Sequence, residues 1–130
     1  MADHPNAALL RSLYEAFGRA DMATIDAGFA DDVTFHLPGK GPLSGAHEGK
    51  QKVFELLGRL VEGSGGTFRL EVHDVLGNDE HAVGLTTNSA SREGKSVSYQ
   101  ATLVAHLRDG KVAEVWEMFD DPNKVDEFWS

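Results

Sequence analysis

The spacing of apolar residues changes near residue 67, and this change limits the possible folds more than any other feature. Upstream of it, apolar side chains recur every three or four residues, as along one face of an α-helix. Downstream, apolar and polar side chains alternate through long segments, as in strands with one buried face. A block of helices followed by a block of antiparallel strands indicates an α+β fold.

Three helices are expected in the first half, followed by a short one at the C-terminal end. Asp3 and Asp21 are suitable N-caps for the first two helices, and the third is expected near residues 50–62 with Gly63 as its stop. A strand is expected at 33–37, before a Gly- and Pro-rich loop at 38–45. Asp121, followed by proline, is typical of the start of the last helix.

The alternating segments predict long strands, which usually curl. They are expected from residue 67, near 81–90, at 97–107 and at about 111–119, with Asp109-Gly110 as a two-residue hairpin turn. We expect a curved antiparallel sheet, a cone-shaped half-barrel packed on the three helices around an internal pocket. By alternation, Asp74 falls on the apolar face of the first of these strands. We therefore expect it to be either a pocket carboxylate or the point where the strand meets its turn.

Composition narrows the functional classes. The chain has 130 residues, 41% of them hydrophobic and 25% charged, which is typical of one domain, here residues 1–130. A net charge of −9 argues against nucleic acid and anionic membrane as partners. Without cysteine there is no thiolate metal site, and the six histidines lack metal-ligand spacing. We expect no metal, no cofactor, no membrane span and a cytoplasmic location.

Several short motifs resemble the SnoaL-like proteins of the nuclear-transport-factor-2-like (NTF2-like) superfamily, over nearly the whole chain. The resemblance implies a curved sheet closed by three helices, an apolar pocket and often a homodimer through the outer sheet face. The motifs are Tyr14-Glu15-Ala16-Phe17, Phe29-Ala30-Asp31-Asp32-Val33, Phe35-His36-Leu37-Pro38-Gly39, Pro42-Leu43-Ser44-Gly45, Arg108-Asp109-Gly110-Lys111-Val112 and Trp116-Glu117-Met118-Phe119-Asp120.

Ketosteroid isomerases of this superfamily use a carboxylate base, with a tyrosine and a neutral aspartic acid as hydrogen-bond donors. The resemblance places the base on Leu37, the tyrosine on Leu13 and the second donor close to Leu103. Leucine transfers no proton, and Tyr14 is one residue away from the tyrosine position, about 100° around a helix. Isomerase activity of that kind is therefore not expected.

Glu117 is the first candidate catalytic residue. It shares a strand face with Val115 and Phe119, whose counterparts in isomerase-like members line the pocket. Limonene epoxide hydrolases, which this stretch resembles, have a carboxylate base in an Asp-x-Phe-Asp segment that matches Glu117-Met118-Phe119-Asp120. In an apolar cavity its pKa would rise and suit it to acid/base work. The alternative is a half-exposed glutamate paired with an arginine.

Asp120 and His36 are the other candidate catalytic residues. SnoaL-like cyclases have an acid/base aspartate that matches Asp120, although their Gln-Leu-Gly tail is absent here; the alternative for Asp120 is a helix cap. His36 lies beside the Gly-rich loop, where it would either shuttle protons near neutral pH or anchor the loop.

Two functions remain open. One is an acid/base enzyme of cyclase, isomerase or hydrolase type on an apolar ring-containing molecule. The other is a non-catalytic binder of a hydrophobic metabolite; recruitment of a protein partner through the sheet has less support. Expected substrate-binding residues are Tyr14, Leu37, Phe119 and Trp116. Tyr14 could instead bond the backbone, and Trp116 could serve in core or dimer packing.

Overall fold

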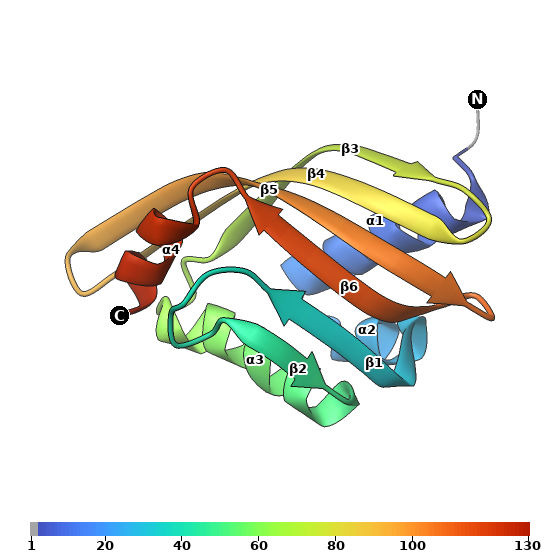
Figure 1. Cartoon of the computed structure of the whole chain (residues 1–130), viewed down its shortest axis with the longest axis horizontal. Helices are drawn as coiled ribbons and strands as arrows, with labels where there is room; N and C mark the ends of the chain where they lie inside the picture. The colour runs from blue at the N-terminus through green and yellow to red at the C-terminus, as the bar shows by residue number, and fades with distance from the viewer. Residues whose placement is uncertain (1–2) are drawn as a thin grey trace.

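The computed structural model describes residues 3–130. Its central element is a six-stranded sheet (Figure 1). In chain order the elements are α1 (Pro5–Gly18), α2 (Met22–Gly28), β1 (Phe29–Leu37), β2 (Gly45–Glu48), α3 (Lys50–Gly63), β3 (Arg69–Gly77), β4 (His81–Arg92), β5 (Lys95–Arg108), β6 (Lys111–Phe119) and α4 (Pro122–Trp129). The predicted α+β class and the curved sheet packed on helices are confirmed.

The strands are ordered β2-β1-β6-β5-β4-β3. All neighbours are antiparallel except β1 and β6, which run parallel because the first strand returns beside the last one rather than beside a hairpin partner. The sequence did not predict β2, since its four residues carry no apolar alternation. The turns Glu93-Gly94 and Asp109-Gly110 have positive φ at both positions, which suits two-residue hairpins.

Helices α1, α2 and α3 cover one face of the sheet (Figure 1): α1 packs on β3 and β4, and both α2 and α3 pack on β1. The N-cap of α1 is His4, whose ring accepts a first-turn amide, whereas Asp3 pairs with Arg11 at 3.1 Å. Asp21 caps α2 as predicted, accepting the Thr24 amide at 3.2 Å. These caps fix where each helix starts above the sheet.

β1 is longer than predicted because Asp31 and Asp32 lie within it. The pairing of β1 with β6 shifts between residues 29 and 34, and both aspartates are exposed there. Lys50 pairs with Asp31 at 3.2 Å, and Arg108 pairs with Asp32. A strand irregularity places both carboxylates in solvent without ending the strand.

A β-bulge interrupts the alternation of β3. Its pairing with β4 skips one residue between Val72 and Asp74, so His73 is the extra residue. After the bulge Val75, and not Asp74, is buried. Asp74 is exposed, and its carboxylate accepts the Val75 amide at 2.8 Å. It is thus neither a pocket carboxylate nor the end of the strand.

The buried side chains form two clusters. The main cluster lies between the sheet and α1, α2 and α3, and its fully buried residues include Ile25, Val33 and Leu56. The C-terminal cluster joins α4, through Val125 and Phe128, to the inner side of β4 and β5. No helix within residues 3–130 has the length and apolarity that a membrane crossing requires.

Candidate active site

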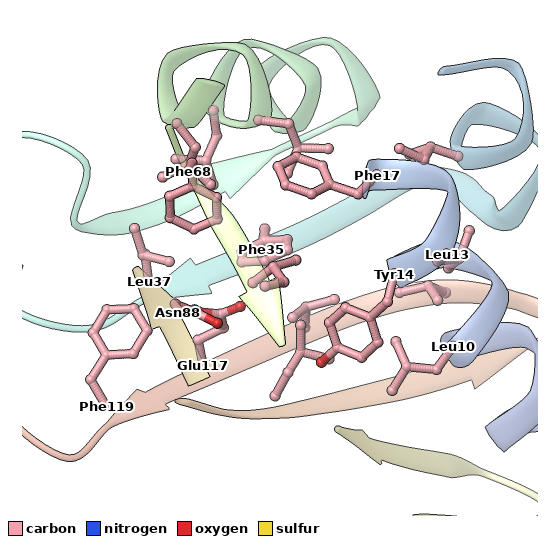
Figure 2. Close-up of a pocket in the computed structure, with 18 of the residues that line it drawn as sticks. Leu10, Leu13, Tyr14, Phe17, Phe35, Leu37, Phe68, Asn88, Glu117 and Phe119 are labelled. Carbon is pink, nitrogen blue, oxygen red and sulfur yellow. The ribbon is translucent and has the colours of Figure 1, made fainter. Parts of the chain in front are cut away.

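A cavity of about 90 Å³ lies between the inner face of the sheet and the helices (Figure 2). Its walls include residues of both hydrophobic clusters and are almost wholly apolar. The lining residues whose side chains carry an oxygen atom are Tyr14, Asn88, Tyr99 and Glu117. One buried water needs roughly 10–15 Å³ of such space, so the cavity can hold several waters or one small ring compound.

The pairing of β4, β5 and β6 places three residues in one row on the sheet side of the cavity. Leu103 of β5 pairs with Gly84 of β4 on one side and with Glu117 of β6 on the other. Because residues directly opposite one another share a face of the sheet, these three positions form one row across three strands. Tyr14 of α1 packs over the glycine end of the row, where a Cβ atom at Gly84 would lie 2.1 Å from its hydroxyl oxygen.

Glu117 places its carboxyl group in this apolar surrounding. The side chain borders the cavity and so keeps some accessibility, but protein encloses the carboxyl group. Burial raises its pKa to about 7, and no hydrogen bond or charge within residues 3–130 adds to this shift. A carboxyl group with such a pKa exchanges protons at neutral pH, which suits a general base or acid.

Two phenols share the cavity with this carboxyl group. Burial raises the pKa of Tyr14 well above its usual value, and the charge of Glu117 adds to the shift. Burial likewise raises the pKa of Tyr99, while the Asn88 side chain opposes the shift and Glu117 adds to it. Both hydroxyls therefore stay protonated near neutral pH and act as hydrogen-bond donors.

Leu37, Tyr14 and Phe119 line the cavity, where the sequence placed them as substrate-binding residues. Leu13 and Leu103, the other two positions of the isomerase machinery, line it as well. The three positions that the resemblance to the isomerases makes polar are therefore leucines on the wall of this cavity. Glu117 is the carboxylic acid among the residues of 3–130 that line this cavity.

His36 and Trp116 lie on the outer face of the sheet. Their rings stack, with centroids 5.6 Å apart, and His36 Nε2 lies 2.6 Å from Glu114 Oε2. Strand alternation explains this placement, because Phe35 and Val115 beside them point inward. The structure therefore does not bring His36 or Trp116 to the cavity, against the roles predicted for them.

Asp120 also lies outside the cavity. It is exposed at the end of β6, and its carboxylate accepts the Gln100 amide at 3.0 Å. The Asp120 amide donates in turn to the Gln100 carbonyl at 3.0 Å, so the residue closes the end of the β5–β6 pair. This position supports neither the predicted acid/base role nor the helix cap, which Asp121 provides by accepting the Lys124 amide.

The sequence did not single out Asn88 or Tyr99. Asn88 is buried and accepts a hydrogen bond from Thr86 at 2.8 Å. Thr86 and Asn88 lie on one face of β4, and two polar side chains on one strand face normally indicate the solvent side. The sequence pattern therefore gave no sign that Asn88 is buried. The direct pairing of Asn88 with Tyr99 across β4 and β5 was the missing information. Within residues 3–130, no three His, Asp or Glu side chains are arranged to hold a metal ion.

Known proteins share this architecture. The family model of the SnoaL-like domain matches residues 10–115. An uncharacterized protein of Mycobacterium tuberculosis (strain ATCC 25618 / H37Rv) is 30% identical over 131 residues, which is 100% of both chains. Bal32a, from a soil-derived mobile gene cassette, is 33% identical with a TM-score of 0.94 over 97% of each chain.

An NTF2-like protein from Burkholderia xenovorans LB400 has a TM-score of 0.82 at 18% identity, with 100% of this chain and 99% of that chain covered, and shares the fold. The matched residues include α2, α3 and the strands β1 to β5 completely and α1 and β6 in part, whereas α4 lies beyond them. The chain therefore belongs to the SnoaL-like domain family and has the NTF2-like fold.

Proposed function

We propose that this protein is an acid/base enzyme that moves a proton on an uncharged, apolar, ring-containing small molecule, with Glu117 as the proton carrier. The observation that supports this most directly is the enclosed carboxyl group of Glu117, with a pKa of about 7, in an otherwise apolar cavity. Active sites typically combine an apolar pocket with a few polar groups of perturbed pKa.

The environment of Glu117 accounts for both halves of a proton transfer. Near pH 7 the ionised and neutral forms are about equally populated, so the group can accept a proton from the substrate and return it at another atom. Burial favours the neutral form after the first transfer. The phenols of Tyr14 and Tyr99 stay protonated and so do not compete for the proton.

The experiment is deuterium exchange from D2O into a panel of single-ring ketones, together with turnover of single-ring epoxides, followed by NMR. Glu117→Gln keeps the shape of the side chain, but its amide neither accepts nor releases a proton near neutral pH, so we expect exchange or turnover to fall at least about 100-fold. Glu114→Gln is the matched control, because Glu114 lies on the same strand but on the outer face. Equal rates in wild type and Glu117→Gln would remove Glu117 from the chemistry.

A second function, the binding of a hydrophobic metabolite without chemistry, is favoured by a separate observation. The three positions that carry catalytic groups in the isomerases are Leu13, Leu37 and Leu103, and all three line the cavity. Under this function the ring compounds bind with equal affinity to wild type and to Glu117→Gln, and neither protein turns them over.

A further inference from the structure

Two histidine side chains lie against each other on neighbouring strands. His81 of β4 pairs directly with His106 of β5, and the centroids of their rings are 5.3 Å apart. The Leu107 amide donates to the Glu80 carbonyl at 2.8 Å, so the hydrogen-bonded pair is the next one along the ladder. His81 and His106 therefore form a non-hydrogen-bonded pair, the kind in which opposite side chains come closest.

Neither ring is engaged by the protein. Within residues 3–130 the rings of His81 and His106 form no hydrogen bond, and both residues are partly exposed. The other four histidines each place Nε2 within 2.6–3.0 Å of a protein oxygen atom; they are His4, His36, His47 and His73. Because a neutral imidazole has one acceptor nitrogen, the pair offers two unused lone pairs side by side.

The backbone fixes the position of the pair. The His81 amide donates to Asn78 Oδ1 at 2.8 Å, and the His81 carbonyl accepts the Asn78 amide at 2.8 Å. On the other side, His106 pairs with Glu114 of β6, so an acidic residue borders the two rings. The rings are thus held together before a ligand arrives, and the nearby carboxylate favours a cation.

From this arrangement we infer that His81 and His106 bind one divalent transition-metal ion, such as Zn2+, between their rings. Imidazole nitrogen suits zinc, copper and nickel ions, whereas magnesium and calcium ions prefer oxygen ligands. Two imidazole rings on one tetrahedral ion have centroids about 5 Å apart, because each nitrogen lies about 2.0–2.1 Å from the ion. The observed separation of 5.3 Å fits that geometry. Water completes the coordination, so the ion exchanges readily.

This site is separate from the cavity. Ala82 and Ala105, the neighbours of the two histidines, point into the main cluster, so the histidines point to the outer face of the sheet. The inference therefore does not depend on the proposed function. Sequence spacing did not indicate the site, because only the register of β4 and β5 brings the two ligands together.

The test is a titration of the 15N-labelled protein with Zn2+, followed through the ring nitrogen resonances of the histidines. We expect the His81 and His106 rings to shift together and to saturate at one ion per chain. His81→Gln and His106→Gln should each weaken binding at least about 10-fold, because one of the two ligands is lost. His73→Gln is the matched control, since His73 lies on a neighbouring strand and its ring contacts Thr87 at 2.6 Å. Mg2+ should shift neither ring.

Thermal unfolding separates a ligand role from a structural one. Zn2+ should raise the unfolding temperature of wild type and of His73→Gln, because the ion binds the folded state. His81→Gln and His106→Gln should unfold at the wild-type temperature without Zn2+ and gain nothing when it is added, because neither ring is bonded to the protein.

Three results would overturn the inference. The first is an unchanged Zn2+ affinity in either of the two glutamine variants. The second is a Zn2+-induced shift of the His73 ring as large as those of the pair. The third is the absence of any shift of the His81 and His106 rings at millimolar Zn2+.

Discussion

Glu114 and Glu117 lie three residues apart on β6 and face opposite sides of the sheet. Glu114 is partly exposed and lies 2.6 Å from His36, whereas the carboxyl group of Glu117 is enclosed in the apolar cavity. An odd separation along a strand produces this division. One strand thus holds two identical groups in different surroundings, and burial raises the pKa of Glu117 to about 7.

The pH dependence of stability tests the burial of Glu117. The pKa of its carboxyl group is about 7 in the folded protein and 4.5 when unperturbed, so the folded state binds more protons between these values. Stability therefore falls as pH rises from 4.5 past 7, by roughly 3 kcal/mol in total from this group. We expect Glu117→Gln to be the more stable protein at pH 8 in urea denaturation, and its advantage to disappear at pH 5. Parallel pH curves for the two proteins would mean that the carboxyl group is hydrated.

Gly84→Ala tests the contact with Tyr14. The added methyl group would lie 2.1 Å from the phenol oxygen and 2.7 Å from two ring carbons. We expect a loss of about 1–3 kcal/mol in chemical denaturation, and recovery of most of it when Tyr14 is replaced by leucine as well. Gly58→Ala is the control, because nothing lies near that position and alanine favours a helix. Additive effects of the two substitutions would contradict the contact.

Asp126 holds α4 against the Gly-rich loop. Its carboxylate accepts the Lys40 amide at 2.7 Å, and Gly39 and Gly41 leave no room for a side chain beside it. We expect Asp126→Ala to cost about 1–3 kcal/mol and to speed amide hydrogen exchange in α4. Glu127→Ala is the control, since Glu127 meets Lys95 through its backbone carbonyl. Unchanged exchange in α4 would show that its apolar contacts alone hold it.

The outer face of the sheet tests the expected homodimer. Trp116, Met118, Leu85 and Leu76 are exposed on this face, with 36–53% of each residue accessible. Apolar groups in neighbouring strands of one face favour association with another surface. We expect sedimentation at twice 14.1 kDa for wild type and a monomer for Trp116→Glu. Val61→Glu, on an exposed surface of α3, should remain a dimer. A wild-type monomer at micromolar concentration would contradict this prediction.

Much of the fold could be predicted because periodicity is a local property. The caps at Asp21 and Asp121 and the Asp109-Gly110 turn follow from neighbours in sequence. Alternation gives the strand face of Glu117, and the resemblance to isomerase-like proteins predicts that this face points inward. The bulge at His73 and the parallel contact of β1 with β6 do not, because both depend on which strands pair. Alternation along β1 and β6 already placed His36 and Trp116 opposite the cavity-facing residues. The catalytic and substrate-binding roles predicted for these two residues conflicted with that pattern, and the structure follows the pattern.

The cavity side chains show the same limit. Tyr14 could be recognised as a candidate, but its close contact with Gly84 is visible only once that distant strand lies beneath it. Asn88 and Tyr99 come together only through the pairing of β4 with β5. A sequence pattern gives each strand its faces, whereas the register between strands decides which polar groups meet.

The position of the cavity between two separate hydrophobic clusters affects which molecules it can admit. A guest larger than the resting space would have to separate α4, whose Val125 and Trp129 line the cavity, from its packing on β4 and β5. The range of acceptable ligands is then governed by the work of that separation. Substitutions in the loop beneath Asp126 would consequently widen or narrow selectivity without touching any atom that contacts the ligand.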